Sequence, residues 1–192
     1  MLKKEDLKEI LRVGAILFAI TAISALVLAT VNSVTAPVIA ANNEKKQAEA
    51  MKVVMPLAAE FEQLQNEPLD AKYYGNVYKA NNEAGEVIGY VALVSANGYG
   101  GEISMVVGVN ADLTVSGIDV ISHSETAGLG AKCDTEEFKA QFAGKTMGVE
   151  VLKNADAENG IDAISSATIT SKAVTQGVNA ALETVKMIVG EE

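Results

Sequence analysis

A chain of 192 residues, of which 49% are hydrophobic, is long enough to bury one core, and we expect one globular domain beside any membrane segment. The net charge of −10 argues against nucleic-acid binding, because an acidic surface repels the phosphate backbone. Cys133 is the only cysteine and His123 the only histidine, which excludes a disulfide framework, a cysteine-ligated iron–sulfur cluster and a multi-histidine metal site.

Residues 13–34 are predicted to form a transmembrane helix. Their first nineteen positions carry no charge, and about twenty apolar residues suffice to cross the hydrocarbon core as a helix. Three lysines and one arginine lie in residues 1–12, whereas the first charge after the run is Glu44. The positive-inside rule therefore predicts a single pass through the cell membrane, with residues 1–12 cytoplasmic and the remainder extracytoplasmic. A cleaved signal peptide is the alternative, because small residues follow the run.

Residues 35–70 are expected to form a helical stalk and a linker. The stretch after Pro37 has a helical composition that stops before Pro56, and proline suits the first turn of a helix. A polar linker around residues 63–70 then leads to the domain, which we expect to occupy residues 71–192.

Short β-rich runs separated by turn residues dominate the first half of this domain. The predicted strands are residues 76–80, 86–96, 102–110 and 113–122. Asparagine, aspartate and glycine between the members of each pair predict two hairpins, and hence about four antiparallel strands. Residues 149–153 can supply one more strand.

Two helices are predicted to flank the sheet. Asp134 with Glu137 predicts a capping box for a helix that Gly144 ends. A longer helix is predicted from Ser171 to Gly190, because its apolar residues recur at helical spacing and line one face. The predicted fold class is therefore α+β, an antiparallel sheet with flanking helices behind one N-terminal transmembrane helix.

Two glycine-rich loops are candidates for holding a ligand. Residues 97–102 contain Tyr99, and their glycines would let the backbone approach a flat ring, although a flexible hairpin loop explains them equally well. Residues 123–132 bring carboxylate, hydroxyl and ammonium groups to a second such loop, as a polar cofactor requires. The candidates there are Glu125, Thr126, Leu129, Gly130 and Lys132. A lone histidine is more often structural than catalytic, and the cysteine that follows the loop is expected to be buried.

A third candidate is the hydroxyl-rich segment of residues 162–171, directly before the last helix. Helix capping alone explains Thr168 or Thr170, because serine and threonine are preferred N-caps. The free amides and the positive dipole end would also suit a phosphate bonded to Thr168. A nucleophilic Ser165 or Ser166 is less favoured, since no G-x-S-x-G elbow surrounds either residue.

Together, the three segments resemble the FMN-binding domain of the G subunit of Rnf-type electron transport complexes, a relative of the C subunit of the sodium-translocating NADH:quinone reductase. The family's flavinylation motif runs Asp, two variable residues, Ser or Thr, Gly, Ala, Thr. It aligns here on Asp162, Ser165, Ser166, Ala167 and Thr168. The family's H-x-E-T-P-G-L-G loop aligns on residues 123–130, and the G-Y-G-G element in residues 98–101 favours the Rnf family.

Two positions depart from the family pattern. Ser166 stands where glycine is usual, so its backbone is expected either to be ordinary or to carry strain of about 1 kcal/mol. Ala127 replaces the usual proline, which loosens the unfolded loop. Neither departure removes the acceptor hydroxyl of Thr168.

The resemblance implies that FMN is esterified to Thr168 through its phosphate and that a separate flavin transferase attaches it from FAD. Asp162, Ser165, Ser166 and Ala167 belong to the implied site. The chain would relay electrons between ferredoxin and NAD beside other integral membrane and peripheral subunits, in a complex that exports sodium ions or protons. No metal and no catalytic residue of its own are expected. Two other hypotheses stay open: an anchored protein that binds a ligand noncovalently or serves assembly of a membrane complex, and an extracytoplasmic hydrolase using Ser165 or Ser166.

Overall fold

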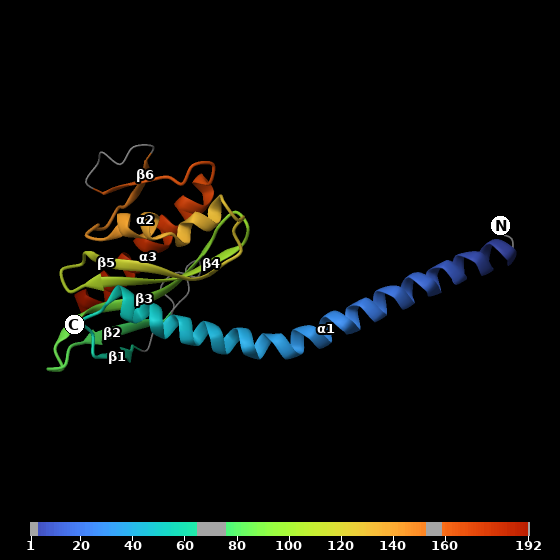
Figure 1. The fold of residues 1–192 in the computed structure, drawn as a ribbon, viewed down its shortest axis with the longest axis horizontal. Helices are drawn as coiled ribbons and strands as arrows, with labels where there is room; N and C mark the ends of the chain where they lie inside the picture. Colours follow the sequence, from blue (N-terminus) through green and yellow to red (C-terminus); the bar gives the residue numbers. More distant parts are fainter. Residues whose placement is uncertain (1–3, 65–75, 153–158, 192) are drawn as a thin grey trace. The chain divides into compact units, whose positions relative to one another are not determined.

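The computed structural model describes residues 4–64, 76–152 and 159–191. The chain divides into two compact units, Met1–Glu44 and Lys45–Glu192, which are treated separately. Helix α1, Lys4–Val54, begins in the first unit and ends in the second. It is one continuous helix with Pro37 in its interior, so the prediction that Pro37 opens a second helix is wrong (Figure 1).

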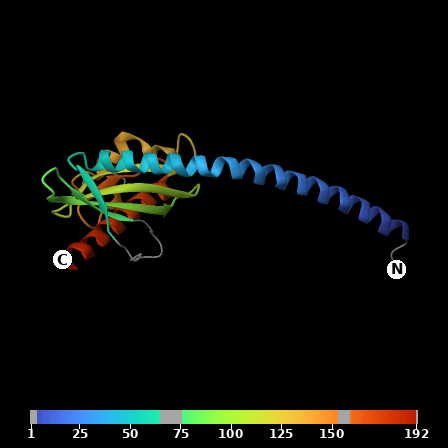
Figure 2. The same cartoon turned by 90° about the horizontal axis from the view of Figure 1, so that it is seen from below.

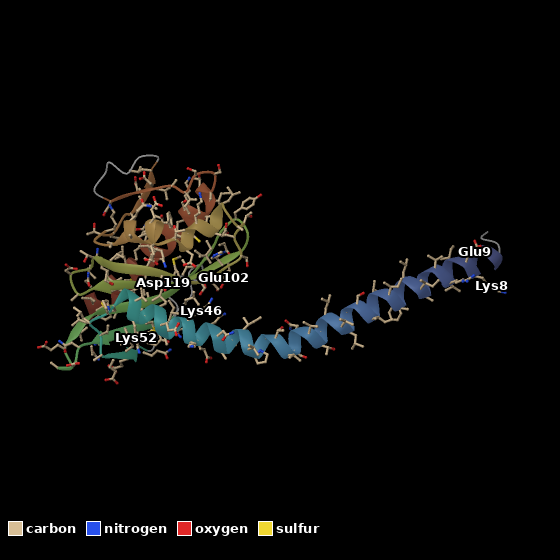
Figure 3. All side chains as sticks on the ribbon, in the orientation of Figure 1. Lys8, Glu9, Lys46, Lys52, Glu102 and Asp119 are labelled. Atoms are coloured by element: carbon tan, nitrogen blue, oxygen red, sulfur yellow. The ribbon has the colours of Figure 1, made fainter. Side chains whose placement is uncertain are left out.

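In the first unit, α1 has the character of a membrane-spanning helix. Its large apolar side chains are exposed and project from all sides of the helix (Figure 3), a pattern that suits hydrocarbon rather than water. The hydroxyls of Thr21, Thr30 and Thr35 donate to carbonyls four residues earlier, at 3.0, 2.8 and 3.0 Å. These polar groups are thus satisfied within the helix, as an apolar surrounding requires. Among the described residues it is the one helix long and apolar enough to cross a membrane.

The second unit contains an antiparallel sheet whose strand order follows the chain. Its strands are β1 (Glu60–Gln63), β2 (Val77–Asn81), β3 (Val87–Asn97), β4 (Glu102–Asn110) and β5 (Val115–His123). Both predicted hairpins, β2–β3 and β4–β5, are confirmed. The edge strand β1 was not predicted, because its sequence EFEQ is polar and only Phe61 is half-buried.

Both faces of the sheet are covered (Figure 2). Helix α3, Thr168–Glu191, packs against one face and completes the larger core, where Val174 and Val178 are fully buried. The other face receives the last turns of α1 through Met51 and Val54. The hydroxyl of Ser116 donates to the carbonyl of Val54 at 2.6 Å and fixes this contact. The last turns of α1, which fall within the predicted stalk and linker of residues 35–70, are therefore part of the compact unit. Most of the predicted linker and the predicted start of the domain at residue 71 lie outside the described residues.

Short elements connect β5 to α3. They are η1 (Gly130–Asp134), α2 (Glu136–Lys139), η2 (Ala140–Phe142), and the strands β6 (Glu150–Leu152) and β7 (Gly160–Asp162), which pair in parallel. Strand β6 confirms the extra strand, although it pairs with the unpredicted β7 and not with the main sheet. The predicted residue range of α3 is confirmed, except that the helix begins three residues earlier than Ser171.

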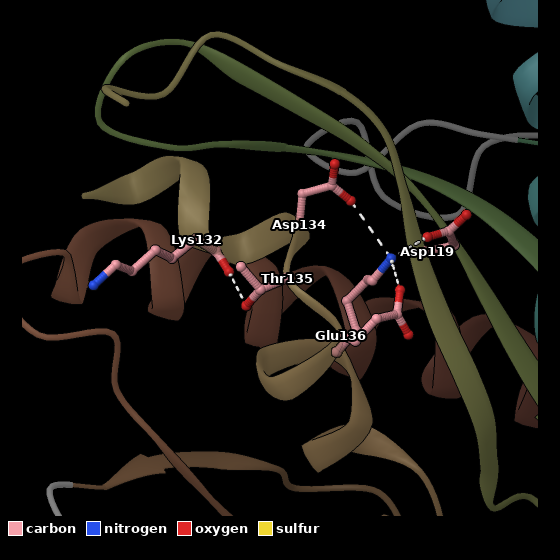
Figure 4. Close-up of polar contacts among 6 residues, drawn as sticks. Asp119, Lys132, Asp134, Thr135 and Glu136 are labelled. Carbon is pink, nitrogen blue, oxygen red and sulfur yellow. Dashed lines mark hydrogen bonds and ion pairs between the residues drawn. The ribbon is translucent and has the colours of Figure 1, made fainter. Parts of the chain in front are cut away.

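The predicted capping box is wrong. Asp134 is the last residue of η1, and Thr135 precedes α2 without a side-chain capping bond. The carboxylate of Asp134 instead lies 3.5 Å from Nζ of Lys139, which Asp119 and Glu136 approach to 2.7 and 2.8 Å (Figure 4). Burial alone would lower the pKa of Lys139, but the hydrogen bonds to these two carboxylates and the negative charge around it outweigh burial and raise that pKa. A nearly buried ammonium needs such partners, and this need overrides local capping.

Candidate functional site

One cavity of about 440 Å³ brings the three predicted loop segments together. Its lining consists of Tyr99, Glu125, Thr126, Leu129, Gly130, Ser166, Ala167, Thr168, Ile169 and Thr170. Eight of these ten residues are among the predicted site residues; Ile169 and Thr170 are the additions. Segments that lie far apart in the sequence meet at this cavity, because three parts of the fold reach the same end of the domain: the turn between β3 and β4, the end of β5 and the start of α3.

Glu125 joins the three segments. Its Oε1 accepts a hydrogen bond from the amide of Gly100 at 2.9 Å, and its Oε2 accepts one from the hydroxyl of Thr170 at 2.7 Å. Glu125 and Thr170 are 9% and 1% exposed, so these bonds are shielded from water. The loop carboxylate thus holds the strand-turn segment and the first turn of α3 in one arrangement.

The glycines next to Glu125 serve close packing within the protein. A Cβ atom at Gly98 or Gly130 would collide with the carboxylate oxygens of Glu125, and one at Gly100 would collide with the carbonyl oxygen of Ser124. The expectation that these glycines make room for a flat ring is therefore not needed to explain them. They let three backbone segments approach one side chain.

The turn before α3 has a left-handed residue at Ser166, where φ is +63°. Of the two expectations for this position, the strained one is thus confirmed, because serine here adopts the conformation that favours glycine. Ser171 stabilises the turn: its hydroxyl accepts the amide of Ile164 at 2.9 Å and donates to the carbonyl of Ala167 at 3.1 Å. A serine that is 0% exposed therefore holds both sides of the turn.

The first residues of α3, Thr168, Ile169 and Thr170, line the larger cavity. Thr168 is the first helical residue, so it does not stand in the N-cap position, and the hydroxyl of Thr170 goes to Glu125. The helix-capping explanation for these two threonines is therefore wrong. Among the described residues, no acceptor is assigned to the amides of Thr168 and Ile169, as expected for the first turn of a helix. Such amides, with the positive end of the helix dipole, form a favourable place for a phosphate.

Three large apolar side chains surround the cavity mouth. Tyr99, Ile169 and Leu129 are 75%, 55% and 44% exposed and come from three different segments. Exposed apolar groups that gather at a cavity mark a binding site more often than single ones on a surface do. The cavity thus combines a polar end at the start of α3 with an apolar rim.

The remaining predicted site residues lie around a second, smaller cavity. Its volume is about 210 Å³, and it is lined by Lys132, Thr135, Glu137, Phe138, Gln141, Asp162, Ala163, Ile164 and Ser165. The structure therefore separates Asp162, Ser165 and Lys132 from the cavity that Thr168 lines. Gln141 positions the end of β7 there, because its Oε1 accepts the amide of Asp162 at 2.7 Å.

His123 and Cys133 have structural surroundings. The half-buried ring of His123 accepts the amide of Glu125 at Nδ1, at 3.2 Å, and borders a different cavity beside β5. Burial raises the pKa of the Cys133 thiol to about 11, with further contributions from Asp134 and Glu125, so the thiol stays protonated and unreactive at neutral pH. Within the described part of the chain, neither cavity with a predicted site residue is lined by a histidine that could activate a serine.

Within the predicted segment of residues 162–171, sequence analysis did not single out Ile169 or Ser171 as site residues, and it gave Thr170 only as a possible helix cap. The clustering of hydroxyls around the start of α3 was the available signal for Thr170 and Ser171. It could not tell which hydroxyl bonds to a distant carboxylate, because that depends on the tertiary fold.

Two family models match the chain. One is described as the RnfG N-terminal region and matches residues 1–54; the other is described as the FMN-binding domain and matches residues 98–183. The second match contains every residue that lines the larger cavity.

Several relatives are similar over nearly the whole chain. The G subunit of the Na⁺-translocating ferredoxin:NAD⁺ oxidoreductase complex of Acetobacterium woodii is 38% identical, with 93% of this chain and 92% of the relative covered. The G subunit of the ion-translocating oxidoreductase complex of Methanosarcina acetivorans is 36% identical, covering 93% and 95%. The G subunit of the proton-translocating ferredoxin:NAD⁺ oxidoreductase complex of Clostridium ljungdahlii is 32% identical, covering 99% of both chains.

Two solved structures have a similar fold. One is the C subunit of the Na⁺-translocating NADH-quinone reductase from Parabacteroides distasonis, with a TM-score of 0.57, 23% identity, and 77% of this chain and 92% of that chain covered. The other is NqrC of Shewanella oneidensis, with a TM-score of 0.55, 19% identity, and coverage of 72% and 74%. These likenesses confirm the α+β fold class.

Proposed function

Since this chain belongs to the family of G subunits of Rnf-type ion-translocating oxidoreductase complexes, we propose that it carries FMN as a phosphoester on Thr168 and relays electrons within such a complex. The relatives' names supply the reaction class, electron transfer between ferredoxin and NAD coupled to ion translocation. The observation that carries the attachment site is the exposed hydroxyl of Thr168 at the first residue of α3, on the wall of the larger cavity.

The residues around this cavity fit FMN. A volume of about 440 Å³ falls within the roughly 300–1,000 Å³ usual for cofactor sites. The first amides of α3 would hold the phosphate, and the apolar rim of Tyr99, Leu129 and Ile169 would contact the ring system. Thr126 and the amide of Gly130 would contact the polar edge of the ring or the ribityl chain. The amide of Leu129 already donates to the carbonyl of Thr126, at 3.2 Å. The flavin, once bound, supplies the electron chemistry, and this chain sets its position and electrostatic surroundings.

Glu125 is proposed as a positioning residue and not as a direct ligand. Both of its carboxylate oxygens already accept hydrogen bonds within the protein, from Gly100 and Thr170. Its negative charge still lies in the cavity wall, where it would disfavour an additional negative charge on the reduced flavin. The buried carboxylate would therefore lower the flavin's reduction potential.

Attachment of FMN requires another enzyme. Glu125 is the one titratable carboxylate among the residues lining the larger cavity, and its oxygens are engaged. A flavin transferase would therefore supply the base. The Thr168 oxygen would attack the FMN phosphorus of FAD while the P–O–P bond breaks; AMP leaves, and the hydroxyl proton goes to the transferase.

The apolar part of α1 would anchor the chain in the cell membrane by a single pass. The excess of lysine and arginine before the span supports a cytoplasmic N-terminus and an extracytoplasmic FMN-binding domain. Its proposed partners are the other subunits of the complex, because a single apolar helix offers no polar path for ions.

Mass spectrometry of the chain purified from its native host tests the attachment. We expect a peptide containing Thr168 that is heavier by FMN less water, and no such addition in Thr168→Ala. Thr170→Ala serves as a hydroxyl control in the same peptide and should keep a modified fraction. A complex that is fully active with an unmodified Thr168 would refute the covalent linkage. FMN that dissociates on denaturation would support noncovalent binding instead.

A further inference from the structure

The larger cavity offers a phosphate no positively charged side chain. Among the described residues that line it, Glu125 is negatively charged and none is a lysine or an arginine. Lys132, which sequence analysis placed at this site, lines the smaller cavity instead. A phosphate on Thr168 would therefore depend on neutral donors, which are backbone amides and hydroxyl groups.

The hydroxyl groups around the acceptor differ in their availability. Thr170 donates to Glu125, and the buried hydroxyl of Ser171 is engaged on both sides of the turn. Ser165 lines the smaller cavity. Ser166 is exposed and lines the larger cavity, and the described part of the chain gives its hydroxyl no hydrogen-bond partner. Apart from the acceptor itself, Ser166 is thus the one residue of the described segment 165–171 with a hydroxyl free to serve a ligand in the larger cavity.

Ser166 is held close to the acceptor in a costly conformation. Its φ of +63° is left-handed, and the turn is closed by the amide of Ala167, which donates to the carbonyl of Ile164 at 2.9 Å. Strained residues of this kind gather at ligand sites, where the strain serves the function. Two residues separate Ser166 from Thr168, so their Cα atoms are at most roughly 7 Å apart. A phosphate on the Thr168 oxygen would thus lie within reach of the Ser166 side chain, on the wall of the same cavity.

We propose that Ser166 binds the phosphate of the attached FMN, its hydroxyl donating a hydrogen bond to one of the phosphate oxygens that carry the negative charge. This inference rests on the proposed function, since it assumes that FMN is esterified to Thr168. A hydrogen bond to a charged oxygen is stronger than one between neutral groups, so it would offset the strain at Ser166. In the flavin-free chain this strain has no such compensation. Ser166 would also fix the phosphate against the first amides of α3 and thereby restrict the direction in which the flavin leaves Thr168.

Urea unfolding of the full chain in detergent, with and without attached FMN, tests the proposal. The chain from its native host carries the flavin, and Thr168→Ala supplies the flavin-free form. With flavin, Ser166→Ala should lower the urea midpoint by roughly 0.5–1 M, because it removes a hydrogen bond to a charged group and keeps the left-handed backbone strain. Without flavin, Ser166→Ala should leave the midpoint unchanged. Ser165→Ala is the matched control, since Ser165 is also exposed but lines the smaller cavity, and it should have the same effect in both forms.

A second variant and a second measurement separate the hydroxyl from the backbone. Ser166→Gly removes both the hydroxyl and the strain, so it should raise the midpoint of the flavin-free form, and this gain should be roughly 0.5–1 M smaller with flavin attached. The phosphorus-31 resonance of the attached FMN should move in Ser166→Ala and stay at its wild-type position in Ser165→Ala.

Two results would overturn the phosphate contact and leave the proposed function intact. One is an equal midpoint change for Ser166→Ala in the two forms, and the other is a phosphorus-31 resonance that does not move in this variant. A wild-type chain from the native host with an unmodified Thr168 would instead refute the proposed function, and the phosphate contact with it.

Discussion

The hydrogen bond between Thr170 and Glu125 can be removed with almost no change in shape by Thr170→Val. The hydroxyl lies 2.7 Å from Oε2 of Glu125, and Thr170 is 1% exposed, so water cannot replace it. Hydrogen bonds to carboxylates contribute roughly 1.5–3 kcal/mol, more than bonds between neutral groups. We therefore expect Thr170→Val to lower the free energy of unfolding by about 2 kcal/mol.

Urea denaturation of the compact unit, followed by circular dichroism, measures this loss. Thr175→Val is the matched control: Thr175 is also buried on α3, but its hydroxyl donates to the carbonyl of Ser171 at 2.9 Å. A neutral bond to a carbonyl within the helix is worth about 1 kcal/mol or less. Losses of the same size in both variants would contradict the special weight given to the carboxylate.

A double-mutant cycle isolates the pair. Glu125→Gln keeps the size of the side chain but weakens its acceptance from Thr170 and Gly100. If the contact acts as inferred, the effects of Glu125→Gln and Thr170→Val are coupled by about 1 kcal/mol or more. Additive effects would show that the two residues stabilise the site independently, and the positioning role of Glu125 would fail.

Three further predictions concern the turn, the thiol and the domain boundary. Ser166→Gly should raise the free energy of unfolding of the flavin-free chain by about 0.5–1 kcal/mol, because glycine adopts the left-handed conformation of residue 166 without strain, whereas Ser165→Gly should not raise it. A lower free energy of unfolding for flavin-free Ser166→Gly in urea denaturation would contradict backbone strain at Ser166. The thiol of Cys133 ionises near pH 9 in the unfolded chain and only near pH 11 in the folded one, so the free energy of unfolding should fall by up to about 3 kcal/mol as pH rises across this window. The free energy of unfolding of Cys133→Ala should fall less over the same window. Parallel curves of unfolding free energy against pH for the two proteins would refute the assignment. A fragment of residues 45–192 should be soluble and show a cooperative thermal transition. A fragment of residues 71–192 should aggregate, because it lacks the last turns of α1, which cover one apolar face of the sheet. Equal solubility of the two fragments on gel filtration would contradict this role of α1.

Elements with a strong local pattern could be predicted from sequence. The two hairpins have β-branched runs on either side of asparagine, aspartate or glycine, and α3 has an apolar face at helical spacing that is buried as expected. Strands β1 and β7 were not predicted, and β6 was predicted without its partner. Each of the three has only three or four residues and is formed by pairing with another segment of the chain. A period of two residues cannot be recognised over so short a run.

The candidate site was predicted in composition but not in arrangement. Its three segments were recognised because glycine and hydroxyl groups gather in each. Sequence did not reveal that Glu125 bonds to Gly100 and Thr170, 25 residues before it and 45 residues after it, or that the acceptor motif borders two cavities. Both depend on long-range contacts, to which local propensity is blind.

The position of α3 after the sheet strands in the sequence has a consequence for the timing of maturation. The hairpins of the sheet form from neighbouring segments and can assemble early, whereas α3 is synthesised after them and completes the larger core. Thr168 opens this helix, and the bond from Thr170 to Glu125 forms only when α3 has docked. A transferase that requires the assembled turn would therefore act only on chains that have finished folding, and bound flavin would report a completed domain.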